Sequence, residues 1–398
     1  MNNEKINTKK VRLVSFVSFV FGFLDAFFIY ILSSYFTTLV PSLHVGVFYF
    51  VAYGIVLLSL LYLERLVRFV GQARALYLSL GGSIVSASLL ATGDSILLLV
   101  VGALLLLVVT NITWVTLDIL LESFSSDRVS GTIRGLYLTI MNAGLLSAPF
   151  LSLKTLDTFG YSGIFLVLVV GYIVVFLIAL VAFRHDNFVP RKRMDITSGI
   201  GRLWRERNLF RIYSISFALE FFYALMIVYT PLYLRLLGFS WEEIGIMFTL
   251  MLLPFVLLQY PLGVLADRYF GEKELLIGSI AVAALATGIL PFLGEKSVVV
   301  WGTALFFTRV GIAGIEILRD AYFYKQIDVS DLDTIAFFRT ARPLANIVGA
   351  LLSGVTLLFL PLQSIFLIVA VVLIWALFET FFLTDTISLK ERIKAHLP

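Results

Sequence analysis

The sequence predicts an all-α, polytopic membrane protein with 12 transmembrane helices in two pseudo-symmetric six-helix bundles. Apolar residues fill 60% of the 398 positions, and mean hydropathy is +0.99. Charged residues make up only 14%, whereas a soluble domain carries about 25%. A chain of this length has too little polar surface to cover one water-soluble fold. We therefore expect most of its surface to face lipid.

Twelve apolar runs approach or exceed the roughly 20 residues that a helix needs to cross the hydrocarbon core. We expect these runs to be helices for two reasons. The backbone groups at an open sheet edge would find no hydrogen-bond partner in lipid, and the runs lack the alternation of polar and apolar residues found in a membrane barrel. The predicted spans cover residues 12–38, 43–63, 75–92, 95–121, 136–153, 160–183, 212–237, 242–265, 275–293, 297–318, 336–360 and 362–384. The basic amino terminus resembles a signal peptide, but the apolar run that follows is too long and carries Asp25, so we expect a retained first span.

An internal repeat links the two halves of the chain. Residues 110–124 (TNITWVTLDILLESF) align with residues 308–322 (TRVGIAGIEILRDAY) at an offset of 198. The alignment matches Asp118 with Glu316, and Asn111 with Arg309. Duplication of an apolar chain is typical of transporters that are built from two similar halves.

Basic residues predict the orientation and the domain boundaries. The amino terminus, the connections after even-numbered spans and the tail hold 26 of the 30 Lys and Arg residues. By the positive-inside rule, both termini are expected in the cytoplasm and the protein in the cell (plasma) membrane. The bundles are then residues 1–183 and 212–384, and residues 385–398 form a cytoplasmic tail. The basic connection 184–211 is either a short helix on the inner leaflet or a solvated linker.

Several other classes of function lack support in the sequence. The chain has no cysteine, which excludes disulfides and thiol catalysis. Its basic residues lie in short connections rather than on one soluble face, so we expect no nucleic-acid partner. His44, His185 and His396 all lie in connections or the tail, and no zinc, nucleophile-elbow or Walker motif occurs, so we expect neither an enzyme nor a cofactor. The acidic run 328–333 either binds a metal or caps the next helix; we favour the cap and expect no metal site.

One loop resembles a family motif. Residues 263–273 read GVLADRYFGEK, in which Gly263, Asp267, Arg268 and Gly271 resemble the Gly-x-x-x-Asp-Arg-x-Gly-basic-basic loop of the major facilitator superfamily. One extra residue precedes Gly271, and an acid follows it where a base is usual. The corresponding loop between the second and third spans, which contains Glu64 and Arg65, matches less closely.

The resemblance implies a monomeric secondary transporter that works by alternating access without ATP. It also implies that spans 1, 4, 7 and 10 line a central small-molecule site. A cytoplasmic gate would then form from the two loops and from acids at nearby helix ends: Gly263, Asp267, Arg268, Gly271, Asp118, Glu316, Glu64 and Arg65. The alternative is that these charged side chains only extend to the membrane interface.

Three ionisable residues lie well inside predicted spans: Asp25, Glu220 and Arg309. A charge at the bilayer centre costs about 2.5–3.5 kcal/mol on insertion scales, so each needs a partner or a purpose. If Arg211 and Arg319 mark the membrane surface, Glu220 and Arg309 lie about 13 Å and about 15 Å deep, and we expect them to pair. Either this is a static ion pair, or Glu220 or Asp25 binds a coupling proton.

The repeat places Asp25 opposite Ala224, one helical turn from Glu220. Asn111, Trp114 and Tyr223 are expected to line the same cavity. Sparse polar groups among many aromatic residues favour an amphipathic cargo. The preferred function is proton-coupled efflux of a small amphipathic or drug-like compound. The alternatives are uptake of a nutrient such as a sugar or organic acid, a channel, a non-transporting scaffold or sensor, and an integral-membrane enzyme.

Overall fold

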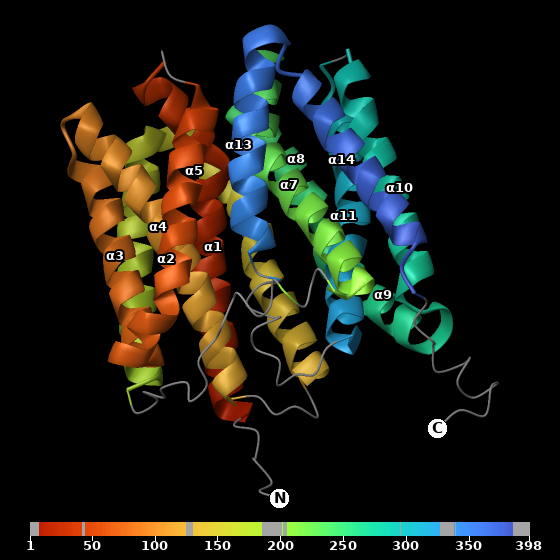
Figure 1. The fold of residues 1–398 in the computed structure, drawn as a ribbon. Helices are drawn as coiled ribbons and strands as arrows, with labels where there is room; N and C mark the ends of the chain where they lie inside the picture. Colours follow the sequence, from red (N-terminus) through yellow and green to blue (C-terminus); the bar gives the residue numbers. More distant parts are fainter. Residues whose placement is uncertain are drawn as a thin grey trace, which may run out of the picture. The chain divides into compact units, whose positions relative to one another are not determined.

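The computed structural model describes residues 8–41, 44–124, 130–184, 201, 205–294, 296–326, 338 and 340–384, and in these residues all regular secondary structure is helical (Figure 1). Most of the basic connection, the acidic run 328–333 and the tail lie outside the described residues, so the predictions for them are not tested. The chain divides into two compact units. Unit 1 holds residues Met1–Arg193 and Ser240–Gly245, and unit 2 holds Met194–Phe239 and Ile246–Pro398.

Unit 1 is a bundle of long apolar helices. Helix α1 packs against α5 and α4, α3 packs against α4 and α5, and α2 packs against α4. The helices are α1 (Thr8–Leu39), α2 (Val45–Val70), α3 (Gln72–Thr92), α4 (Ile96–Phe124) and α5 (Ser130–Ala182).

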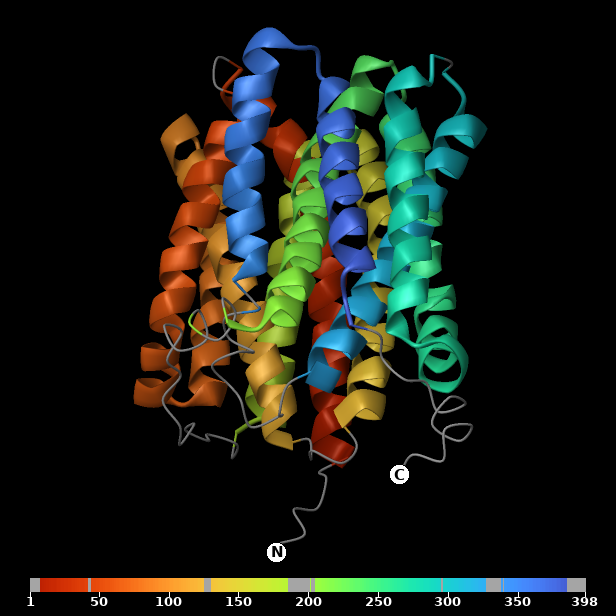
Figure 2. The same cartoon turned by 45° about the vertical axis from the view of Figure 1, so that its right-hand side comes forward.

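Unit 2 is also a helical bundle (Figure 2). Helix α7 packs against α11, α13 and α14, while α10 packs against α11 and α14, and α9 packs against α11. Its helices are α7 (Arg207–Leu236), most of α8 (Trp241–Leu257), α9 (Gln259–Leu265), α10 (Glu272–Ile289), α11 (Val298–Gln326), α13 (Ala341–Phe359) and α14 (Ser364–Phe381). The start of α8, up to Gly245, belongs to unit 1. A π-helical turn, Ala266–Phe270, and a 3₁₀ turn, Leu290–Phe292, flank α10.

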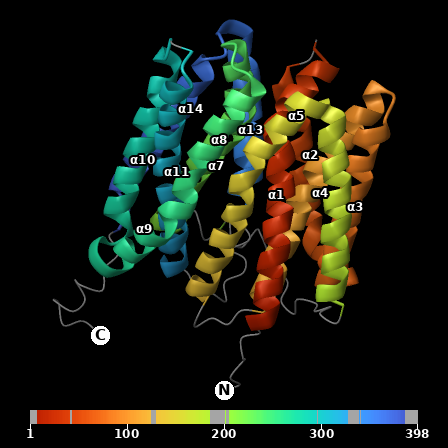
Figure 3. The same ribbon diagram turned by 180° about the vertical axis from the view of Figure 1, so that it is seen from behind.

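The predicted spans map onto these helices with two differences. The fifth and sixth spans form one helix, α5, interrupted at Gly160 by a left-handed backbone (φ 65°, ψ −166°) that lets its limbs run in opposite directions (Figure 3). The eighth span is split between α8 and α9. Pro261 explains that split, because its ring clashes with the carbonyl of Leu257, the last residue of α8. In the described residues, ten helices are long and apolar enough to cross a membrane, and α2 holds a shorter apolar stretch, Val45–Leu60.

The same tight turn occurs in both units. Gly71 (φ 91°, ψ 160°) precedes α3, and Gly271 (φ 76°, ψ 175°) precedes α10. The Gly71 N–H donates to the Val67 carbonyl at 2.8 Å, and the Gly271 N–H donates to the Ala266 carbonyl at 3.0 Å. Only glycine adopts this backbone region without strain. The turn is therefore repeated even though the loop sequences around it differ.

We expect Gly271→Ala to lower the free energy of unfolding by about 1–3 kcal/mol, because a Cβ is strained at this backbone conformation. The control is Gly278→Ala in the same helix, where a Cβ meets no atom within 4 Å and alanine favours helix by about 1 kcal/mol. The midpoint of thermal unfolding in detergent is measured for both purified variants and for the unaltered protein. Equal midpoints for the two variants would contradict this account of the turn.

Candidate functional site

Unit 1 holds Asp25 at mid-helix on α1. The indole N–H of Trp114 on α4 donates to Asp25 Oδ2 at 2.9 Å. Both side chains are half-buried, and the ring of Phe21, fully buried, packs edge-on against the Trp114 ring at 5.0 Å. The structure therefore brings together two residues that the sequence assigned to one cavity, and it connects α1 to α4.

The other predicted polar residues of α4 lie on either side of Trp114. Asn111 is half-buried and donates its amide to the carbonyl of Leu107 in its own helix at 2.8 Å. Asp118 is half-buried one turn further along. One N–H of the Asn111 amide is thus used within α4.

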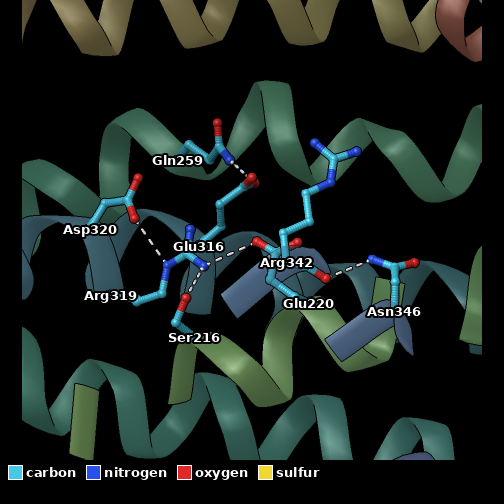
Figure 4. Close-up of polar contacts among 8 residues, drawn as sticks. All are labelled: Ser216, Glu220, Gln259, Glu316, Arg319, Asp320, Arg342 and Asn346. Atoms are coloured by element: carbon cyan, nitrogen blue, oxygen red, sulfur yellow. Dashed lines mark hydrogen bonds and ion pairs between the residues drawn. The ribbon is translucent and has the colours of Figure 1, made fainter. Parts of the chain in front are cut away.

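Unit 2 contains a cluster around Arg319, whose side chain is buried at 8% exposure. Its Nη1 donates to Ser216 Oγ at 2.9 Å and to Glu220 Oε1 at 3.3 Å, both on α7. Its Nε donates to Asp320 Oδ1 at 3.0 Å (Figure 4). We call Ser216, Glu220, Arg319 and Asp320 the Arg319 cluster. It connects α7 to α11 through charge-assisted hydrogen bonds, which are among the stronger kind.

A second contact lies beside this cluster. Gln259, at the start of α9, donates its amide Nε2 to Glu316 Oε2 at 2.9 Å and so connects α9 to α11 (Figure 4). From α13, Asn346 donates its amide to the carbonyl of Arg342 at 2.9 Å, and the Arg342 side chain is exposed. Figure 4 shows residues of four helices, α7, α9, α11 and α13, gathered in this part of unit 2.

Arg309 lies against aromatic rings of α7. Its guanidinium carbon is 4.7 Å from the centre of the Phe222 ring and 5.9 Å from that of Tyr223. The residue is only 2% exposed. Cation–π contact is one of the few favourable environments for a guanidinium that has left water, so these rings help to keep Arg309 inside the bundle.

Glu220 pairs with Arg319 in the structure, whereas the sequence predicted Arg309. The depth estimate failed because it took Arg319 as a residue at the membrane surface. Arg319 is buried, and α11 continues beyond it to Gln326. At 1.5 Å per residue, Arg309 lies about 25 Å from the end of α11, and Glu220 lies about 20 Å from the start of α7. The overlooked signal was the spacing of Glu316, Arg319 and Asp320, which places two acids and a base on one helix face.

The structure describes the side chains of only some of the predicted gate residues. A Cβ built on Gly263 would lie 3.8 Å from Ile317 Cγ1, so this glycine lies beside α11. Arg65 is exposed and lies 5.4 Å from the centre of the Tyr62 ring. The side chains of Glu64, Asp267 and Arg268 lie outside the described ones, so the gate stays a prediction.

Glu272 forms an ion pair that the sequence analysis missed. This carboxylate is fully buried at the first position of α10, and Lys325 Nζ in the last turn of α11 pairs with it. Glu272 occupies the position where the family motif usually has a base. Each charge also suits the helix end on which it lies, an acid at the start of α10 and a base at the end of α11.

A double-mutant cycle tests the partner of Glu220. We expect Glu220→Gln and Arg319→Gln to show a coupling energy of about 1–3 kcal/mol, because Arg319→Gln removes the counter-charge of Glu220 and Glu220→Gln removes one of the two carboxylates paired with Arg319. The matched cycle combines Glu220→Gln with Arg309→Gln and should show a smaller coupling. The free energy of unfolding of each variant, measured with denaturant, gives the coupling energies of both cycles. Additive losses for Glu220 and Arg319, or a larger coupling with Arg309, would contradict the assignment.

The chain resembles known proteins both in sequence and in fold. A sequence model of the Major Facilitator Superfamily matches residues 14–327 and 242–396. No curated protein sequence matches the chain. Among solved structures, the crystal structure of a mutant of the nucleoside transporter NupG superposes with a TM-score of 0.71 at 14% identity, covering 94% of this chain and 99% of that one. At this identity the likeness shows the fold, and it confirms the prediction of a helical membrane protein with two bundles.

Proposed function

Since the chain belongs to the major facilitator superfamily of membrane transporters, we propose that it exports a small amphipathic compound in exchange for protons, by alternating access. Family membership makes it a transporter of a small molecule rather than an enzyme. The coupling ion, the direction and the cargo class are the proposal, and they rest on the residues below.

Orientation is the first part of the proposal. Lys10 and Arg12 lie in the first turns of α1, Arg207 and Arg211 in those of α7, and Lys325 in the last turn of α11. All belong to the basic ends of the positive-inside pattern, which supports cytoplasmic termini in the plasma membrane.

The observation that carries the proposal is a repeated arrangement. In each unit the first helix bears an acid inside the apolar span, and a donor on the fourth span holds it. In unit 1 this is Asp25 with Trp114, and in unit 2 it is Glu220 with Arg319. Acids inside a membrane are costly and mark ion or proton pathways by default.

The two donors differ in a way that separates the roles of the acids. An indole N–H donates to a carboxylate and, more weakly, to the carbonyl oxygen of a protonated acid, so the Asp25–Trp114 contact can form in both states. The Glu220–Arg319 pair loses its charge attraction if Glu220 is protonated. We therefore assign proton binding to Asp25 and a structural role to Glu220.

The amide side chains support an amphipathic cargo rather than a sugar. The amides of Asn111, Gln259 and Asn346 each donate one of their two N–H groups within their own unit, namely to the Leu107 carbonyl, Glu316 and the Arg342 carbonyl, which leaves fewer donors for a cargo. A polyhydroxy compound needs several such donors to replace its water. Aromatic faces beside one carboxylate, as at Phe21, Trp114 and Asp25, suit a compound with an apolar body and a polar end.

The cargo is identified first by a stabilisation screen. A compound that binds the folded protein raises its unfolding temperature by mass action. The panel covers amphipathic drugs, sugars, nucleosides, peptides and organic acids, each at two pH values. Stabilisation by amphipathic compounds alone is the expected result, and stabilisation by sugars alone would contradict the cargo class.

Asp25→Asn is expected to abolish uphill transport of the compound that the screen identifies. With a gradient of one pH unit, exchange for one proton supports about a tenfold concentration ratio, and this ratio should fall to about one in the variant. Exchange without a gradient should persist, because Asn accepts the same Trp114 hydrogen bond. Both uphill accumulation and exchange without a gradient are measured in proteoliposomes that contain the purified protein.

Asp157→Asn is the matched control, because Asp157 is an exposed acid in α5, outside the site. It should transport like the unaltered protein. Undiminished accumulation by Asp25→Asn would refute the role of Asp25 as the coupling carboxyl.

A further inference from the structure

Three carboxylates lie around one buried guanidinium in unit 2, and one of them differs from the others. Arg319 directs its described hydrogen bonds to Glu220, Asp320 and the Ser216 hydroxyl. Glu316 lies one turn before Arg319 on the same helix, yet its carboxylate accepts from the neutral amide of Gln259 (Figure 4). Among the described residues, Glu316 forms no ion pair within 4.0 Å.

The charges that surround Glu316 do not supply a counter-ion of its own. Helix α7 contributes Glu220 and the phenol of Tyr223, α9 contributes the neutral Gln259, and α13 contributes the exposed Arg342. Helix α11 contributes Arg319 and Asp320, and also Arg309, whose guanidinium lies against the rings of Phe222 and Tyr223. Arg319 already serves two acids. A third negative charge in this half-buried position therefore needs either a cation or a proton.

We propose that Glu316 is a second proton-binding residue of the transporter, separate from Asp25. One proton adds to the carboxylate to give the neutral acid, and its release restores the charge, with no other bond formed or broken. The inference extends the proposed proton coupling, because it adds a second proton to the cycle.

The Gln259 amide suits both states of this carboxyl. Its N–H donates to the carboxylate, as in the structure, and after rotation about its last bond its carbonyl oxygen accepts from the protonated acid. The pairing parallels that of Asp25 with the Trp114 indole. In both units, a neutral N–H group donates to an acid inside the bundle.

Helix α9 connects this acid to the family motif. Gln259 begins a short helix of seven residues, separated from α8 by the break before Pro261. That helix continues into the π-helical turn Ala266–Phe270 and then to Gly271. A change of the Glu316–Gln259 hydrogen bond on protonation would therefore act on the loop that holds Asp267 and Arg268.

Infrared spectroscopy of the purified, reconstituted protein tests the proposal without a substrate, since the probe is the proton itself. The carbonyl stretch of protonated carboxylic acids is followed while pH is lowered from about 9 to about 5, the range in which buried acids in proteins have been found to titrate. We expect Glu316→Gln to lose one titrating carboxyl band. Asp320→Asn, the matched acid that Arg319 neutralises, should retain it.

A spectrum of Glu316→Gln with every titrating band intact, or loss of the band in Asp320→Asn instead, would overturn the proposal. If Glu316→Gln fails to fold, Gln259→Leu provides a second test, because this variant keeps Glu316 and removes its hydrogen-bond donor. The Glu316 carboxyl band should then shift in frequency. An unchanged band would also overturn the proposal. Asp25→Asn separates the two claims. If the Asp25→Asn variant still accumulates substrate while the Glu316→Gln variant loses a titrating carboxyl band, the proposed role of Asp25 fails and that of Glu316 stands.

Discussion

The cost of an unpartnered polar or charged group in hydrocarbon is the constraint on which the rest of this structure depends. It forces the backbone into helices, since lipid offers no partner for peptide groups. It also forces each charge inside the spans to find a partner within its own bundle. Arg319 meets that requirement for two carboxylates and a hydroxyl at once. The rings of Phe222 and Tyr223 provide part of the partner that the buried charge of Arg309 requires.

The internal repeat gives the two units similar helices and turns, although their sequences differ. The tight turns at Gly71 and Gly271 are equivalent, and the first helix of each unit carries an acid, at positions one helical turn apart in the repeat. A neutral indole donates to the acid in unit 1, and a guanidinium donates to the acid in unit 2. This asymmetry fits a division of labour in which one acid exchanges its proton and the other holds two helices together.

Hydropathy and the repeat predict the helical membrane fold and most span positions, because these depend only on composition along the chain. They also bring Asp25 and Trp114 to one site, since both lie at mid-helix on spans expected to adjoin. The partner of Glu220 depends on the rotation and register of α7 against α11, which side-chain packing decides. Arg319 misled the estimate because arginine usually marks a membrane surface. The Glu272–Lys325 pair was missed for a similar reason, since a buried acid at a helix start looks like a solvated one.

The central claim is that groups at mid-depth are reached from each side of the membrane in turn. The chain has no native cysteine, so a single cysteine at Ala224 of α7 is a unique reporter. Ala224 is half-buried and lies one turn from Glu220. Labelling with a membrane-impermeant thiol reagent, applied to either face at two pH values, is the most direct measurement. The account predicts modification from both faces, with a ratio that changes with pH, and modification from one face under every condition would contradict it.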